Sequence, residues 1–213
     1  DFNEIKLIRV VQGCGVATIL LNLTALWKQE KVRPMTKEEM AQSRPIFHEG
    51  WRDLLAGGTA GRLLLVVMLG TMGFQMQDVL LEPYGAQILG LSVGATTWLT
   101  ACNAMGALIG FVLAGHWMAQ GQDMFRMSAR GILVGVVAFV MVIMAAPLHS
   151  GELFFAGAWC IGLGAGLFAV STLTAAMALP EQGHAGRGLV LGAWGAAQAT
   201  AAGLSIAIGG GLR

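Results

Sequence analysis

The sequence predicts an all-α fold made of several membrane-spanning helices, and three features of its composition support this prediction. Of its 213 residues, 55% are hydrophobic and 12% are charged, whereas a soluble domain carries about 25% charged residues. The mean hydropathy is +0.67. The chain also contains 31 glycines, and small residues let helices approach one another closely in lipid. We therefore expect a polytopic membrane protein.

Six apolar segments divide the chain, and each approaches the ~17–25 residues that a spanning helix needs. These segments are 10–27, 63–81, 97–115, 131–146, 153–179 and 189–209. The chain is therefore expected to consist of one helix in residues 1–27, a polar linker in residues 28–62 and five helices in residues 63–213.

The polar linker is expected to contain short helices. Residues 36–39, Thr-Lys-Glu-Glu, have the spacing of a helix capping box. Farther along, Phe47, Trp51 and Leu55 recur every fourth residue, with Leu54 beside them. This amphipathic pattern fits a helix that lies in the membrane interface, and it equally fits a helix that packs on the ends of the spans.

The junction between the second and third spans combines a carboxylate, a proline and several glycines. Asp78 lies near the end of the second span. We expect Pro83 to end that helix, because proline has no N–H for the helical hydrogen bond. The glycines that predict a compact turn before the third span are Gly85, Gly90 and Gly94.

Four spans carry pairs of glycines that are four residues apart. The pairs are Gly106 and Gly110, Gly131 and Gly135, Gly162 and Gly166, and Gly188 and Gly192. In apolar helices such pairs indicate close helix contacts. We expect them to serve packing alone.

Basic residues are concentrated in alternate connections between the spans. Seven lie in residues 28–62, whereas the connections 82–96 and 147–152 contain none. The two other basic connections carry Arg126, Arg130 and Arg187. Because loops rich in Lys and Arg stay on the cytoplasmic side, residues 28–62 are predicted to be cytoplasmic.

Three segments resemble a known family. They are residues 5–30 (IKLIRVVQGCGVATILLNLTALWKQE), residues 76–101 (MQDVLLEPYGAQILGLSVGATTWLTA) and the Ala-Arg-Gly of residues 129–131. They are similar to the PucC/LhaA family, the bacteriochlorophyll-delivery branch of the major facilitator superfamily. The most specific part is QDVLLEPYG, residues 77–85. The turn at residues 115–126 departs from the form that facilitator transporters carry there.

The resemblance implies a partial major facilitator fold. Residues 1–27 would be the sixth of twelve helices, which ends the N-terminal half, and residues 63–213 would hold the seventh to eleventh helices. One span, a long basic loop and five further spans make a lopsided layout, and the chain does not begin with methionine. We therefore expect it to be an internal piece of a longer protein.

The resemblance also implies a function. Members of this family are expected to help bacteriochlorophyll and light-harvesting antenna polypeptides come together in the bacterial inner, intracytoplasmic photosynthetic membrane. The implied cofactor is bacteriochlorophyll. The implied partners are the antenna polypeptides, the reaction-centre core complex, pigment-synthesis enzymes and lipid, with no nucleic acid.

The sharpest candidate residues lie in the matched QDVLLEPYG segment and just before it. Gln75, Asp78 and Glu82 follow an i, i+3, i+7 pattern, which predicts that they share one helix face. This face, with Tyr84 of the same motif, fits a contact with a partner or with a polar substituent of the pigment. The alternative is that the carboxylates pair or cap locally near the headgroups.

Pigment magnesium needs an axial ligand, and the best candidates are His116 and Asn103. An imidazole is a common ligand, and a side-chain carbonyl oxygen also suits a hard cation. Trp117 is a candidate for stacking on the pigment. The alternatives are an interfacial polar residue for His116, an interfacial anchor for Trp117 and a helix–helix hydrogen bond for Asn103. Three other amides inside spans, Gln12, Asn22 and Gln198, are expected to bond neighbouring helices.

The sequence contains no nucleophile elbow, phosphate-binding glycine loop or zinc-binding His/Glu spacing. We therefore expect a protein that is not an enzyme. The preferred hypothesis is an assembly factor for light-harvesting complexes. The alternative is a secondary transporter of a small solute, a class that tends to keep ionisable groups near mid-membrane.

Overall fold

The computed structural model describes residues 4–27, 47–56, 58–179 and 187–211, and all regular secondary structure in these ranges is helical. The chain divides into two compact units, Asp1–Arg44 and Pro45–Arg213. The predicted capping box at residues 36–39 lies outside the described residues.

The first unit contains helix α1, Glu4–Leu26, of 23 residues. Its polar side chains bond to its own backbone, since Thr18 Oγ1 donates to the carbonyl of Cys14 at 2.8 Å. Asn22 Nδ2 likewise donates to the carbonyl of Thr18 at 2.8 Å. An amide four residues along the same helix finds an acceptor without a partner helix. The expectation that Asn22 bonds a neighbouring helix stays a prediction.

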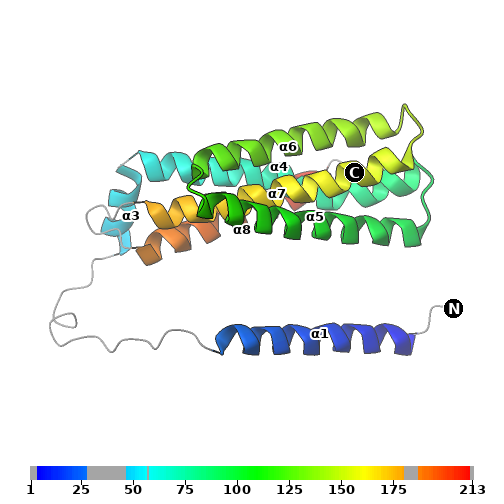
Figure 1. Cartoon of the computed structure of the whole chain (residues 1–213), viewed down its shortest axis with the longest axis horizontal. Helices are drawn as coiled ribbons and strands as arrows, with labels where there is room; N and C mark the ends of the chain where they lie inside the picture. Colours follow the sequence, from blue (N-terminus) through cyan, green and yellow to red (C-terminus); the bar gives the residue numbers. More distant parts are fainter. Residues whose placement is uncertain (1–3, 28–46, 57, 180–186, 212–213) are drawn as a thin grey trace. The chain divides into compact units, whose positions relative to one another are not determined.

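The second unit contains a short helix and five long ones. They are α3 (Phe47–Ala56), α4 (Thr59–Gln87), α5 (Val93–Ala119), α6 (Met124–Ala145), α7 (Gly151–Ala178) and α8 (Arg187–Gly211) (Figure 1). Among the described residues, the five long helices are long and apolar enough to cross a membrane. The predicted class, an all-helical polytopic membrane protein, is confirmed.

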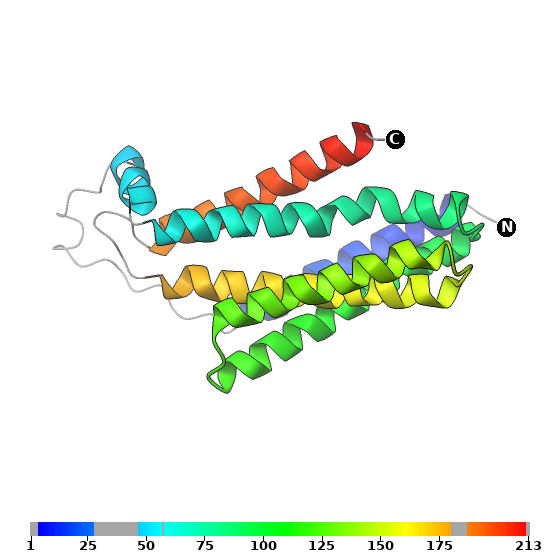
Figure 2. The same ribbon diagram turned by 90° about the horizontal axis from the view of Figure 1, so that it is seen from above.

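Helix α7 occupies the centre of this unit. Helices α5 and α6 pack most extensively on α7, whereas α4 packs most extensively on α8. Figure 2 shows α4 and α8 on one side of α7, with α5 and α6 on the other. We call α5, α7 and α6 the three-helix layer, and α4 with α8 the outer pair.

Glycines hold the three-helix layer together. A Cβ built on Gly131 would lie 2.8 Å from the carbonyl oxygen of Gly164, so α6 and α7 touch backbone to backbone there. A Cβ on Gly162 would likewise collide with the carbonyl of Asn103 in α5. The predicted close contacts are confirmed for three pairs. They are wrong for Gly188 and Gly192, where a Cβ would meet no described residue within 4 Å.

Helix α4 continues past Pro83 to Gln87, so the expectation that Pro83 ends it is wrong. A proline removes only one i→i−4 hydrogen bond, and neighbouring helices let membrane helices tolerate that loss. The predicted compact turn is correspondingly shorter. Only Gly90, at φ 64°, lies in it, whereas Gly85 belongs to α4 and Gly94 to α5.

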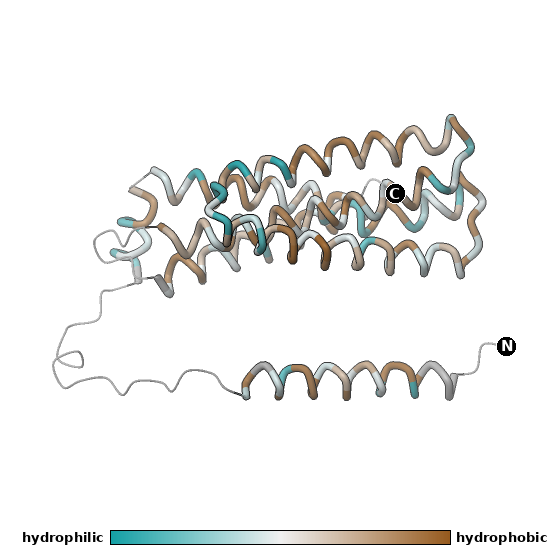
Figure 3. Tube along the Cα trace, viewed as in Figure 1, coloured by the Kyte–Doolittle hydropathy of each residue, from teal (hydrophilic) through white to brown (hydrophobic). Residues whose placement is uncertain are grey.

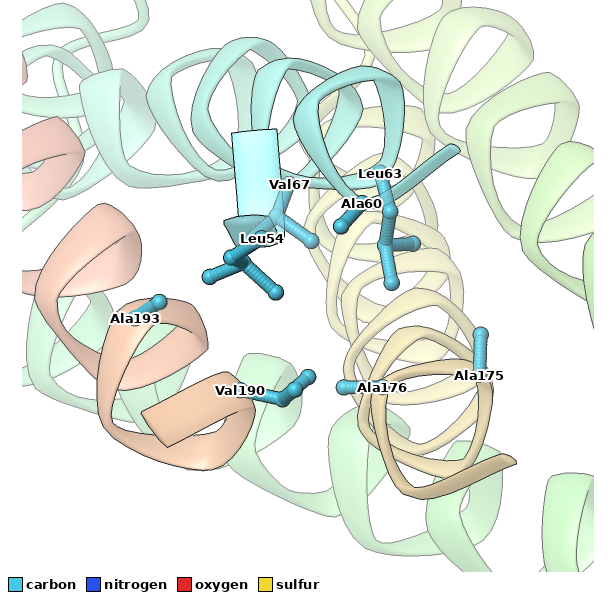
Figure 4. Packing of buried hydrophobic residues seen from close by; sticks show 8 residues of the cluster. All are labelled: Leu54, Ala60, Leu63, Val67, Ala175, Ala176, Val190 and Ala193. Atoms are coloured by element: carbon cyan, nitrogen blue, oxygen red, sulfur yellow. The ribbon is translucent and has the colours of Figure 1, made fainter. Parts of the chain in front are cut away.

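Helix α3 packs on the end of the helix bundle. Leu54 is only 4% exposed. Figure 4 shows it among residues of α4, α7 and α8, namely Ala60, Leu63, Val67, Ala175, Ala176, Val190 and Ala193. Trp51 packs against the same cluster, whereas Leu55 is 44% exposed. The buried face of α3 is therefore that of Leu54 and Trp51, which agrees with the packing interpretation.

Basic residues gather at one end of the second unit. Arg62 is in the first turn of α4, Arg126 is in the first turn of α6, and Arg187 begins α8. Because consecutive helices run antiparallel, these positions share an end. In Figure 3 hydrophilic segments appear there, at α3 and at the connection from α5 to α6.

Candidate functional site

Cavities lie on different sides of α4, where it meets the three-helix layer and α8. The first is a cleft of 310 Å³ between α4 and α5. It is lined by Gln77, Asp78, Leu81, Glu82, Leu99, Thr100 and Asn103. We call it the carboxylate cleft.

Hydrogen bonds tie the polar residues of the carboxylate cleft together. Gln77 Nε2 donates to Asp78 Oδ1 at 2.8 Å, and Thr100 Oγ1 donates to Glu82 Oε1 at 3.2 Å. Asn103 Nδ2 donates to Gln77 Oε1 at 3.3 Å and to the carbonyl of Ala158 in α7 at 3.2 Å. The Asn103 amide therefore joins three helices, as expected for a helix–helix hydrogen bond.

The carboxylate cleft has more acceptors than donors. Its Asn103 and Thr100 donors are already used, while the carboxylates of Asp78 and Glu82 are exposed and none of the residues that line the cleft is basic. Helix α4 has 29 residues, so Asp78 lies about 7.5 Å from its midpoint, inside the ~15 Å half-thickness of the hydrocarbon core. The cleft is suited to a group that donates hydrogen bonds.

A second cavity, of 430 Å³, lies between α4, α7 and α8. Its polar side chains are Thr71, Gln75 and Gln198, and its rings are Phe74 and Phe168. In the described part of the chain none of the three polar side chains makes a hydrogen bond. We call it the amide cavity.

The amide cavity lies near the midpoints of its three helices. Gln75 is two residues from the middle of α4, and Gln198 is one residue from the middle of α8. An unpaired amide or hydroxyl group costs free energy at this depth, since lipid offers it no partner. The centroids of the Phe74 and Phe168 rings lie 5.8 Å apart beside these groups. The cavity combines flat apolar walls with neutral donors and acceptors, which suits a hydrophobic ligand with polar substituents.

The residues predicted to share one face of α4 lie in different cavities. Asp78 and Glu82 line the carboxylate cleft, whereas Gln75 lines the amide cavity. Gln75 lies about 60° around the helix from Asp78 and about 20° from Glu82, so the three positions share one face by helical geometry. That face opens on two cavities at different levels, the amide cavity at Gln75 and the carboxylate cleft at Asp78 and Glu82.

Tyr84 lies on a third side of α4, facing α6. It lines an apolar cavity of 510 Å³ between these helices. Its hydroxyl donates to the carbonyl of Ile143 at 3.4 Å, and its ring centroid lies 5.7 Å from that of Phe154. Tyr84 is therefore separated from the carboxylates of its own sequence motif.

His116 and Trp117 lie in the last turn of α5, and neither lines the three cavities described above. His116 Nε2 lies 2.9 Å from Gln120 Nε2, and Trp117 packs beside Met127 and Leu167. Among the described residues, no three His, Cys, Asp or Glu side chains come together as metal ligands. The ligand roles suggested for His116 and Asn103 stay predictions.

Sequence reasoning missed the amide cavity. Gln198 was expected to bond a neighbouring helix, but it makes no hydrogen bond in the described part of the chain. One signal was available, since Thr71 and Gln75 are four residues apart in an apolar helix and therefore share a face. No comparable pattern in the sequence indicated that Phe168 of α7 would line this cavity.

The family of the chain follows from comparison with known proteins. The family model described as PUCC protein matches residues 1–213. The chain belongs to the PucC family. A relative of this PucC-family chain, "Uncharacterized protein in puhA-bchM intergenic region" of Rhodobacter capsulatus, is 56% identical over 213 residues. Protein PucC of Rhodovulum sulfidophilum is 46% identical over 216 residues.

A more distant relative of the PucC-family chain is the bacteriochlorophyll synthase 44.5 kDa chain of Rhodobacter capsulatus, 28% identical over 211 residues. These three alignments cover 100%, 100% and 97% of this chain, but only 44%, 47% and 48% of the respective relatives. The chain therefore spans less than half the length of these curated relatives. No solved structure matches it.

Proposed function

We propose that this PucC-family membrane protein is an assembly factor for photosynthetic light-harvesting complexes that binds bacteriochlorophyll and docks antenna polypeptides without catalysing a reaction. Family membership supports the proposal, as do relatives named for PucC and for bacteriochlorophyll synthase. The observation that carries it is the amide cavity, with its unpartnered Thr71, Gln75 and Gln198 beside two phenylalanine rings.

The amide cavity fits one edge of a pigment. The cavity has a volume of 430 Å³, which is smaller than a whole bacteriochlorophyll, so the rest of the pigment would lie among lipid. The amide N–H groups of Gln75 and Gln198 would donate to carbonyl substituents, and Phe74 and Phe168 would contact the macrocycle. A glutamine carbonyl oxygen suits magnesium as a hard ligand, and His116 and Asn103 remain further ligand candidates.

The carboxylate cleft supports the docking part of the proposal. Its exposed acceptors, Asp78 and Glu82, are suited to donor groups on antenna polypeptides. Further proposed partners are the reaction-centre core complex and pigment-synthesis enzymes. The proposed location is the bacterial inner, intracytoplasmic photosynthetic membrane, with residues 28–62 cytoplasmic, because the basic end of the second unit follows the positive-inside rule.

The pigment-binding proposal is tested by purifying the full chain gently from pigmented membranes and recording its absorbance. We expect bound bacteriochlorophyll and copurifying antenna polypeptides. The triple variant Thr71→Val, Gln75→Leu, Gln198→Leu is expected to lose at least tenfold of the bound pigment. The matched control Gln87→Leu removes an amide from the α4–α6 cavity instead and is expected to retain pigment. Preparations that contain neither pigment nor antenna polypeptides contradict the proposal.

A second candidate function is secondary transport of a small solute, and the mid-membrane position of the amide cavity favours it, because transporters place substrate sites there. Uptake by vesicles that contain the full chain distinguishes the two functions. Solute uptake that Asp78→Asn abolishes, in a protein without pigment, would establish the transporter in place of the assembly factor.

A further inference from the structure

Another cavity, of 350 Å³, lies where the first turns of α4 and α6 meet the last turns of α7. Its floor includes Leu63 and Ala175, which are 6% and 2% exposed. Its rim includes Val66, Phe125 and Ile132, which are 43%, 51% and 37% exposed. The cavity is therefore apolar and opens on the flank of the helix bundle. We call it the Arg62 cavity.

Two polar groups in the Arg62 cavity lack partners. The Arg62 guanidinium is exposed and makes no ion pair or hydrogen bond in the described part of the chain. Ser128 is only 6% exposed, and its hydroxyl also has no partner among the described residues. In the described part of the chain every fully buried side-chain N or O atom has a hydrogen-bond partner, so the unpartnered Ser128 hydroxyl opens on the cavity. A free hydroxyl and an unpaired guanidinium that line the same apolar cavity indicate a ligand with negatively charged oxygens.

The depth of the Arg62 cavity fits a membrane lipid. Arg62 lies about 4.5 Å along α4 from its start, and Val66 about 10 Å. Helix α4 has 29 residues, about 43 Å, so each end extends roughly 6–7 Å beyond a ~30 Å hydrocarbon core. Arg62 is therefore at the level of the headgroups, and Val66 is at the level of the acyl chains.

We propose that the Arg62 cavity binds one anionic phospholipid from the leaflet at the basic end of the bundle. The Arg62 guanidinium binds the phosphate, as planar guanidinium groups do in charge-assisted pairs. The Ser128 hydroxyl donates to a phosphate or ester oxygen, and an acyl chain lies against Val66 and Ile132. Basic pockets between spanning helices are typical sites for anionic headgroups. This site is independent of the proposed pigment function.

The experiment uses the full chain in nanodiscs of phosphatidylcholine, with or without phosphatidylglycerol. Native mass spectrometry counts retained phosphatidylglycerol, and tryptophan fluorescence gives the Tm. We expect one retained phosphatidylglycerol and a raised Tm, because a ligand that binds only the folded state stabilises it. Arg62→Gln is expected to weaken the preference for phosphatidylglycerol roughly tenfold, Ser128→Ala less, and Ala129→Phe to block the cavity.

The matched control is Arg52→Gln, which removes the same charge from an exposed position of α3 at the same end but outside the cavity. Its Tm shift is expected to equal that of the unmodified chain. An equal loss in Arg52→Gln and Arg62→Gln would overturn the site, since it would indicate diffuse attraction to an anionic surface. A Tm rise in phosphatidylcholine from inorganic phosphate alone would overturn the lipid assignment. No retained phosphatidylglycerol would overturn the proposal.

Discussion

The three-helix layer and the side of α4 differ in how closely their helices approach. In the layer, the backbones of α5 and α6 touch that of α7 at glycines, and a Cβ at Gly131 or Gly164 would lie within 3 Å of a neighbouring backbone atom. Along α4, cavities of 310, 430 and 510 Å³ lie between parts of the helix and its neighbours. Tight backbone contact supplies a rigid support, and the loosely packed helix leaves room for ligands.

The largest expected effect comes from a substitution that disrupts the three-helix layer. Gly162→Val would drive a side chain into the carbonyl of Asn103 in α5, and overpacking of this kind costs about 3 kcal/mol or more. We expect the helices to separate at lower denaturant, as measured by unfolding of the purified chain in mixed micelles. Gly192→Val is the control, because no atom of the described residues lies within 4 Å of a Cβ there. Equal losses in the two variants would show that close backbone approach does not hold the layer together.

A smaller effect is expected where the two regions meet. Asn103→Leu removes two hydrogen bonds, to Gln77 of α4 and to the carbonyl of Ala158 in α7. We expect a loss of about 1–2 kcal/mol in the free energy of unfolding, since interhelical bonds in membranes contribute modestly. Thr96→Val, which removes a bond within one helix, is expected to cost less than about 0.5 kcal/mol. A neutral Asn103→Leu would mean that α4 is held by packing alone.

The smallest expected effect has the opposite sign. Thr71→Val removes a hydroxyl that lines the amide cavity and has no partner in the described part of the chain. Without ligand, we expect it to raise the free energy of unfolding by about 0.5–1 kcal/mol, since an unpaired polar group is costly at mid-membrane depth. Thr172→Val is the counterpart, because Thr172 Oγ1 accepts a bond from Trp194 Nε1 at 3.4 Å. It is expected to destabilise the chain. A destabilising Thr71→Val would indicate that the hydroxyl is already satisfied.

Local sequence patterns predicted the positions of the helices better than they predicted which helices pack together. The length of the apolar segments identified α4 to α8. Pro83 was wrongly predicted to end α4, because the sequence shows the loss of one N–H but does not show the helix packing that compensates for it. Glycine spacing predicted Gly106 and Gly162 correctly, yet at Gly188 the same spacing has no described residue within 4 Å of a Cβ. A helical repeat gives the direction of a side chain, and only the fold decides which helix it meets. Gln75 illustrates this limit.

The central place of α7 also has a consequence for biogenesis. Helices α5 and α6 pack on α7 and make few contacts with each other in the described part of the chain. During synthesis α5 and α6 enter the membrane before α7, so Gly106, Gly110 and Gly131, whose close neighbours belong to α7, lack those neighbours until α7 enters the bilayer. The order of translation thus makes insertion of α7 the step that completes this layer. Any delay before α7 is inserted leaves α5 and α6 as a helical hairpin without its main packing partner.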